Sequence, residues 1–205
     1  MEAHPDPPKL DREAPFYDHI VCLGKFAPSL SPHLRNKIRE SLHSDGALKE
    51  VENAIFQYDK SFRALASTTQ AIDLVGGGVK TNALPESAWA VVNHRISTQS
   101  SVNSTKERDS ALFVELAEKF GLRYQAFGKS ISTQGKNGLL MLEDAFGTSL
   151  EPAPVTPTTA ESEPFILLSG SIKSSYASRV RQTNQGTEEI FIAPGHSTGN
   201  TGTLY

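Results

Sequence analysis

The sequence has little cysteine, no long apolar run and no large excess of charge. Its 205 residues include one cysteine, Cys22, which excludes an internal disulfide and a zinc site made of several cysteines. No apolar run approaches the roughly 20 residues that cross a bilayer, so no membrane segment is predicted in this chain. The net charge of −3 argues against a nucleic-acid partner, because such proteins usually carry a basic surface.

Local features of the first half give a few further expectations. Residues 1–14 are rich in proline and charge and lack the apolar core of a secretory signal, so we interpret them as an extended arm. Cys22 lies on the apolar side of a predicted helix, where a buried, unreactive thiol is expected. One glycosylation sequon, Asn103-Ser104-Thr105, hints at a secretory lumen.

Apolar periodicity predicts most of the secondary structure. Apolar residues recur at spacings of three and four in the first third of the chain and again between Leu112 and Phe120, which is typical of amphipathic helices. Ser104 and Glu107 have the spacing of a capping box that begins the later helix, and Gly121 ends it. Helices are predicted over 16–26, 34–42, 48–55, 104–120 and 164–177, and strands over 68–75, 89–96, 122–127, 138–143 and 188–194.

The order of these elements predicts an α+β fold. In the middle of the chain it reads strand, strand, helix, strand, strand, which gives a two-layer α/β sandwich with an antiparallel sheet. The proline- and threonine-rich stretch from Glu151 to Pro164 is a candidate domain boundary. One helix and one strand follow it, and such a short segment cannot bury a core alone.

Three familiar chemistries find little support in the sequence. The six histidines include no HExxH motif, and His94 either is buried in a strand or faces a cleft. The stretch GGGVKT lacks the glycine spacing of a phosphate loop. The pattern GHSTG at 195–199 fits a serine nucleophile elbow at Ser197, but no acid or histidine follows it to complete a triad.

The strongest candidate for substrate recognition is Asn82 together with Arg95. Asn82 lies in the tetrapeptide NALP after a glycine-rich turn, and Arg95 lies thirteen positions later near the end of the next predicted strand. An amide and a guanidinium would then sit at opposite ends of one short strand unit. A guanidinium fork on a rigid strand is a common clamp for a carboxylate, so this pair is interpreted as recognising a carboxylate or a carbonyl.

Five stretches carry a family resemblance, and they occur in a fixed order: TTQAIDLVGG, GGGVKTNALPES, VNHRI followed by SSV, LEPAPVTPT, and TGNTGT. Together they resemble the lid (dimerisation) domain and part of the catalytic domain of M20-family zinc peptidases, and most nearly the fungal carboxypeptidase S-like branch. The similarity runs from about Phe16 to Thr203. The last stretch is similar to a GNTDT loop, with Gly202 in place of the aspartate.

The resemblance implies a two-domain hydrolase. One domain would hold two zinc ions, an activated water and a glutamate general base, and the other would be an inserted lid with an antiparallel sheet. On this resemblance residues 15–150 form the lid without its first strand and helix. Residues 151–205 would form part of the α/β catalytic domain.

The resemblance also implies roles for individual residues. The lid asparagine that matches Asn82 holds the scissile carbonyl, and the arginine that matches Arg95 clamps the substrate carboxylate. Gly199, Asn200 and Thr201 match a loop of the catalytic domain that contacts substrate. Substrates implied in this way are peptides or N-acyl amino acids, and the implied compartment is the vacuole or another secretory space.

No metal ligand can be carried over from the family. In the family the ligands lie on an HxD motif, an acidic residue and a Glu-Glu pair, all N-terminal to the lid, and on a histidine near the C-terminus, and the resemblance implies that this sequence begins inside the lid and ends before that histidine. We therefore expect the chain alone to bind no catalytic zinc, to contain no catalytic residue and to turn over nothing. The alternative hypothesis is a non-catalytic module that forms a homodimer through its sheet edge and a helix.

Overall fold

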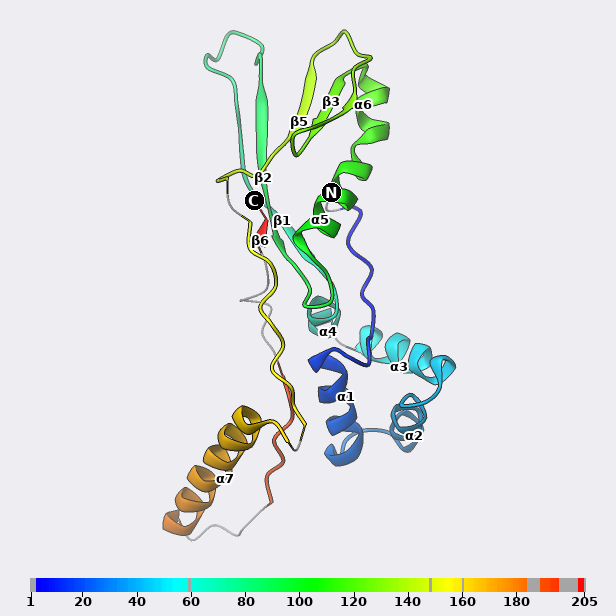
Figure 1. The fold of residues 1–205 in the computed structure, drawn as a ribbon, viewed down its shortest axis with the longest axis vertical. Helices are drawn as coiled ribbons and strands as arrows, with labels where there is room; N and C mark the ends of the chain where they lie inside the picture. Colours follow the sequence, from blue (N-terminus) through cyan, green and yellow to red (C-terminus); the bar gives the residue numbers. More distant parts are fainter. Residues whose placement is uncertain are drawn as a thin grey trace. The chain divides into compact units, whose positions relative to one another are not determined.

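The computed structural model describes residues 3–58, 60–147, 149–159, 161–183, 189–195 and 203–204 (Figure 1). They fall into two compact units. Unit 1 contains the described parts of Met1–Pro8, Ala64–Ala153 and Ser197–Tyr205, and unit 2 contains those of Lys9–Arg63 and Pro154–His196. These units do not follow the predicted boundaries after residues 14 and 150, so the assignment of a lid and a catalytic domain stays a prediction.

Unit 2 is helical. Helix α2 begins with Pro32 directly after Ser31, whose side chain accepts a hydrogen bond from the Leu34 amide at 3.2 Å. The buried residues Ile20, Ile38 and Val51 come from three successive helices and recur at the predicted apolar positions. The helices of unit 2 are α1 Pro15–Phe26, α2 Pro32–Glu40, α3 Asp45–Tyr58 and α7 Glu163–Thr183, and α4 Lys60–Leu65 spans the division of the chain after Arg63.

Part of the predicted N-terminal arm packs into unit 2. Leu10 is only 1% exposed, and its amide donates a hydrogen bond to the buried Glu52 carboxylate at 2.9 Å. The Arg12 side chain donates to the Ser41 carbonyl and to Asp45, each at 2.8 Å. The segment after Lys9 is thus held by specific contacts rather than extending free of the helices.

Unit 1 contains two three-stranded sheets, which confirms the α+β class. Strands β1 (Thr69–Gly77) and β2 (Ala88–Arg95) form an antiparallel hairpin with a bulge between Ile72 and Leu74. Strand β6 (Thr203–Leu204) pairs with the other edge of β2, opposite His94 and Arg95 only. The second sheet has the order β4-β3-β5, with an antiparallel β3–β4 pair and a parallel β3–β5 pair. These strands are β3 Arg123–Ala126, β4 Lys129–Ser132 and β5 Leu139–Leu142.

Helices α5 (Val102–Leu112) and α6 (Val114–Phe120) follow the hairpin. The predicted capping box at Ser104 is wrong, because the helix begins one turn earlier: the Ser101 hydroxyl accepts a hydrogen bond from the Ser104 amide. Gly121 ends α6 with φ of 62°, a conformation that favours glycine, as predicted. The core near these helices contains Tyr124, Ala117 and Ala126.

Other local predictions are corrected by the structure. Leu116 and Phe120 belong to the predicted apolar stripe but are exposed, whereas Thr105 and Asp109 are buried. The described part of the predicted strand at 188–194 is irregular, and β4, β6 and α4 were not predicted. Cys22 is half-buried, and burial raises the pKa of its thiol, which lowers the thiolate fraction at neutral pH. Among the described residues, no helix combines the length and apolarity that a membrane span requires.

Candidate functional site

Asn82 and Arg95 lie at opposite ends of the β1–β2 hairpin. The last pair of the ladder is Gly77 with Ala88, so Asn82 belongs to the exposed loop that joins the strands. Arg95 pairs with Thr69 at the other end of the ladder, and its side chain is exposed. At about 3.3 Å per residue, β2 alone separates the two ends by about 23 Å. Within one chain the Asn82 amide and the Arg95 guanidinium are therefore too far apart to bind the same small chemical group of a substrate.

The remaining predicted site residues lie outside the described residues. Gly199, Asn200 and Thr201, which the family resemblance implies as a substrate loop, belong to the segment 196–202, which the structure does not describe. Ser197 of the GHSTG pattern belongs to the same segment. Their assignments stay predictions.

A pocket of about 480 Å³ lies in unit 1. Residues of β2 and of β5 form two of its walls, and helix α5 contributes Asp109. Phe113 and Phe127, which also pack against the core, add aromatic surface. The lining is mainly apolar, and it consists of Ala88, Trp89, Ala90, Val91, Val92, His94, Asp109, Phe113, Phe127, Leu140, Met141, Leu142, Glu143 and Ala145.

The polar side of this pocket is a buried histidine–aspartate pair. His94 Nε2 lies 3.1 Å from Asp109 Oδ2, and the two side chains are 2% and 3% exposed. The contact is close but not aligned as a hydrogen bond, and within the described residues neither ring nitrogen of His94 has a hydrogen-bond partner. Buried polar atoms normally have such a partner, so a polar group of a ligand could supply one from the pocket.

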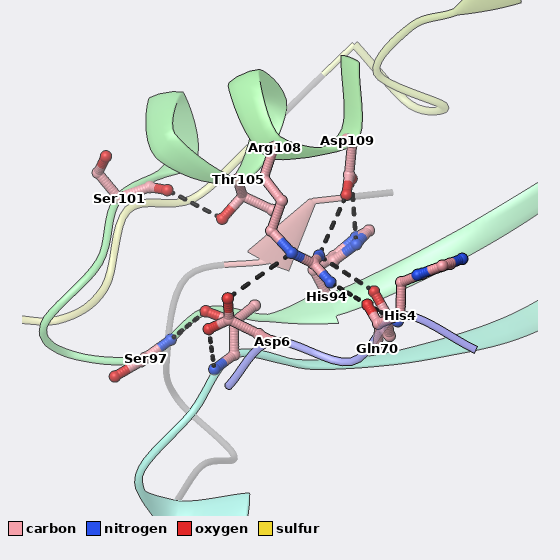
Figure 2. Close-up of polar contacts among 10 residues, drawn as sticks. His4, Asp6, Gln70, His94, Ser97, Ser101, Thr105, Arg108 and Asp109 are labelled. Carbon is pink, nitrogen blue, oxygen red and sulfur yellow. Dashed lines mark hydrogen bonds and ion pairs between the residues drawn. The ribbon is translucent and has the colours of Figure 1, made fainter. Parts of the chain in front are cut away.

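Arg108 joins this pair to the N-terminal segment of unit 1 (Figure 2). Its guanidinium lies 3.4 Å from Asp109, donates to Gln70 at 3.3 Å and contacts the His4 carbonyl. It also lies 3.6 Å from the carboxylate of Asp6. Figure 2 shows the arginine reaching from the helix toward the N-terminal segment while Asp109 faces His94. These contacts tie Asp109, at the polar end of the pocket, to the N-terminal segment of unit 1 through Arg108.

The described residues do not fit a zinc site. Within that part of the chain, no three His, Cys, Asp or Glu side chains are grouped so that they could hold a metal ion. His94 and Asp109 provide two candidate ligands, whereas catalytic zinc usually has three protein ligands. No chemical step is therefore derived through a metal held by these residues.

Comparison with known proteins identifies relatives named carboxypeptidases. A protein of Saccharomyces cerevisiae that is provisionally named a carboxypeptidase is 32% identical over all of this chain, which covers 34% of that protein. Carboxypeptidase S of the same yeast is 30% identical over the whole chain and 34% of its own length. An uncharacterized carboxypeptidase of Schizosaccharomyces pombe is 25% identical over 82% of this chain and 27% of that protein.

These similarities support a carboxypeptidase family for the chain. The chain spans about a third of the length of the curated relatives that it matches. No protein-family model matches the sequence, and no solved structure matches it.

Sequence reasoning missed the pocket and the pair at its polar end. The alternation of the strand placed His94 on the face opposite Arg95 and left open whether His94 is buried or faces a cleft; in the structure His94 is buried and Arg95 is exposed. The burial of Asp109 was not predicted, because the predicted apolar stripe of its helix placed other residues in the core. A buried acid facing a strand histidine depends on how α5 packs on β2, which periodicity alone does not specify.

Proposed function

We propose that this chain is part of a carboxypeptidase of the M20 zinc-peptidase type, in which unit 1 binds the free carboxylate of a peptide substrate. The observation that carries the proposal is sequence similarity, over the whole chain, to proteins named carboxypeptidases. The ordered motifs from TTQAIDLVGG to TGNTGT support the narrower assignment to the M20 type.

Arg95 is the proposed carboxylate ligand. Its side chain is exposed and makes no ion pair or hydrogen bond with the other described residues. Its backbone is held between two partners, Thr69 of β1 and Thr203 of β6, so the side chain extends from a fixed strand. A guanidinium can donate two parallel hydrogen bonds to one carboxylate, which gives both affinity and orientation.

Asn82 is proposed as a separate substrate contact. The carboxylate of a peptide and the carbonyl of its last amide bond are neighbours, whereas Asn82 and Arg95 lie at opposite ends of the hairpin. One chain in this conformation cannot place both side chains on the same C-terminal residue. Two copies could do so, each contributing one of the two side chains, and the proposed homodimer is compatible with this arrangement.

The proposal limits unit 1 to binding and orienting the substrate. In an M20-type enzyme two zinc ions would activate the attacking water. The described residues offer no site for them, so the metal ligands and the general base would come from outside this part of the chain. The chain alone is expected to bind no catalytic zinc and to hydrolyse no peptide, and tight binding of about two zinc ions per chain would contradict this.

Replacing Arg95 tests the proposed carboxylate site. We expect Arg95→Gln to weaken binding of an N-acetylated dipeptide with a free carboxylate by about tenfold to a hundredfold, because a charge-assisted hydrogen bond is worth about 1.5–3 kcal/mol. Isothermal titration calorimetry measures the change. Arg123→Gln is the matched control, since it removes the same charge from an exposed position on β3, and it should leave binding unchanged. Equal weakening by both variants would contradict a specific role for Arg95.

The exposed apolar surface of the hairpin favours one alternative function, a dimerisation module. Ile72, Leu74, Val75 and Trp89 are 42%, 51%, 75% and 55% exposed. Apolar patches of this kind often mark protein interfaces. This alternative predicts a dimer in sedimentation experiments that Val75→Lys converts to a monomer. A chain that sediments as a monomer at every concentration would contradict it.

A further inference from the structure

We infer that Asn103 is an acceptor for an N-linked glycan, and that the glycan can be added only before helix α5 folds. The motif Asn103-Ser104-Thr105 has the sequence that such a transfer requires, an asparagine followed two positions later by a hydroxyl residue with no proline between them. In the structure the acceptor side chain is exposed, whereas the threonine that completes the motif is buried.

The Asn103 side chain has room for a glycan in the folded chain. Asn103 lies in the first turn of α5 and is exposed. Its Nδ2 atom donates a hydrogen bond to the exposed Glu107 carboxylate at 2.8 Å. An asparagine amide has two N–H groups, so replacing one hydrogen by a sugar leaves the other for this bond. A glycan on Asn103 therefore removes no buried contact of unit 1.

The rest of the motif is closed in the folded chain. Thr105 is 3% exposed, and its hydroxyl donates to the Ser101 carbonyl at 3.0 Å (Figure 2). The Ser104 amide donates to the Ser101 hydroxyl, which in turn donates to the Ser104 hydroxyl, each at 3.1 Å. Residues two positions apart on a helix do not face each other, so Asn103 and Thr105 lie on different sides of α5. A transferase that must recognise both residues needs this turn unfolded.

The order of synthesis provides a period in which the turn is open. The first amide of α5, on Val102, donates to the Glu151 carboxylate at 2.9 Å, and the two residues are 49 positions apart. Synthesis at about 5–20 residues per second takes roughly 2–10 s to cover that distance. Until then the first turn lacks this partner, and a helix of 11 residues without tertiary packing is marginal in water.

The donor of the transfer is an oligosaccharide joined to a lipid through a pyrophosphate. A bond forms between Asn103 Nδ2 and the first carbon of the sugar, and the bond between that carbon and the pyrophosphate oxygen breaks. The lipid pyrophosphate leaves with the electron pair, and the proton lost from Nδ2 passes to a base of the transferase. This chain supplies only the acceptor nitrogen.

The inference does not depend on the proposed function. Asn103 does not line the pocket of unit 1, and transfer to it requires neither Arg95 nor a peptide substrate. Failure of the proposed carboxylate site would therefore leave the acceptor site intact, and the reverse also holds.

Translation of the whole chain with microsomes, behind a cleavable secretion signal, tests the acceptor. Chains that protease protection shows to be inside the microsomes should gain one increment of apparent mass, which endoglycosidase H removes. Asn103→Gln keeps a side-chain amide and should abolish the increment. Asn137→Gln is the matched control and should retain it, because Asn137 is also exposed but has no hydroxyl residue two positions later. A protected chain without the increment, or an increment that survives Asn103→Gln, would overturn the inference.

Transfer to the purified chain tests whether folding closes the site. Purified oligosaccharyltransferase and its lipid-linked donor are supplied with the folded chain or with an end-blocked peptide of residues 99–109. We expect the peptide to be glycosylated at least about tenfold faster, because the folded chain must first open the start of α5. Equal rates for the folded chain and the peptide would overturn the claim that the glycan is added only before folding.

Discussion

Replacing Tyr124 by alanine is expected to lower the unfolding free energy of unit 1 by about 3–5 kcal/mol. The Tyr124 ring is fully buried and packs with Ala117 and Ala126 in the core next to the pocket. Truncation removes this apolar contact and leaves a cavity that the surrounding strands cannot close. Urea denaturation followed by circular dichroism measures the loss.

The conservative replacement of Tyr124 separates packing from hydrogen bonding. The Tyr124 hydroxyl donates to the Ser110 carbonyl at 2.8 Å, so Tyr124→Phe should cost only about 1 kcal/mol. Burial also raises the pKa of Tyr124 above its ordinary value of 10.0, so the folded state favours the neutral phenol. The stability linked to this group is complete below the ordinary pKa and is lost as the pH rises through the raised one. Tyr124→Phe should remove this alkaline loss, and equal effects of phenylalanine and alanine would contradict the packing role.

Removing His94 should destabilise unit 1 by roughly 2–4 kcal/mol, because His94→Leu leaves the Asp109 carboxylate buried without its nearest partner. The contact of Asp109 with Arg108 at 3.4 Å remains in this variant. The expected loss of stability is therefore smaller than for a buried charge that has no partner. Chemical denaturation of the variant gives the value.

A second substitution tests whether the buried charge causes this loss. Adding Asp109→Asn to His94→Leu neutralises the carboxylate with little change of volume, and it should recover much of the lost stability. Lys106→Gln is the control, because the Lys106–Asp144 pair is partly exposed and should contribute about 1 kcal/mol or less. A double variant that is less stable than His94→Leu would show that the charge is not the cause.

The elements that the sequence predicted well are those with a strong local signal. Apolar spacing and proline positions located α1, α2 and α3, and the β-branched runs located β1 and β2 within a residue or two. The apolar run at 188–194 had an equally strong signal, yet its described part forms no strand. A strand needs a partner edge, and the sequence of a single segment does not say whether one is present.

Pairings between distant segments were beyond local reasoning. Strand β6 has only two residues and pairs with β2 across more than a hundred positions, and the parallel pairing of β3 with β5 has no local signature. The motifs placed Arg95 near the end of a strand and Asn82 after a glycine-rich turn at the opposite end of the strand unit, and the structure has the two residues at opposite ends of the hairpin. The pocket could not be predicted, because its walls come from β2, α5 and β5, which only the tertiary structure brings together.

The central claim is that unit 1 recognises the free carboxylate of a peptide. The most direct measurement compares, by calorimetry on the unmodified chain, one N-acetylated dipeptide as its free acid and as its C-terminal amide. The account predicts that the acid binds at least about tenfold more tightly, and that added salt weakens the acid much more than the amide. Equal affinity for the acid and the amide at low salt would contradict it.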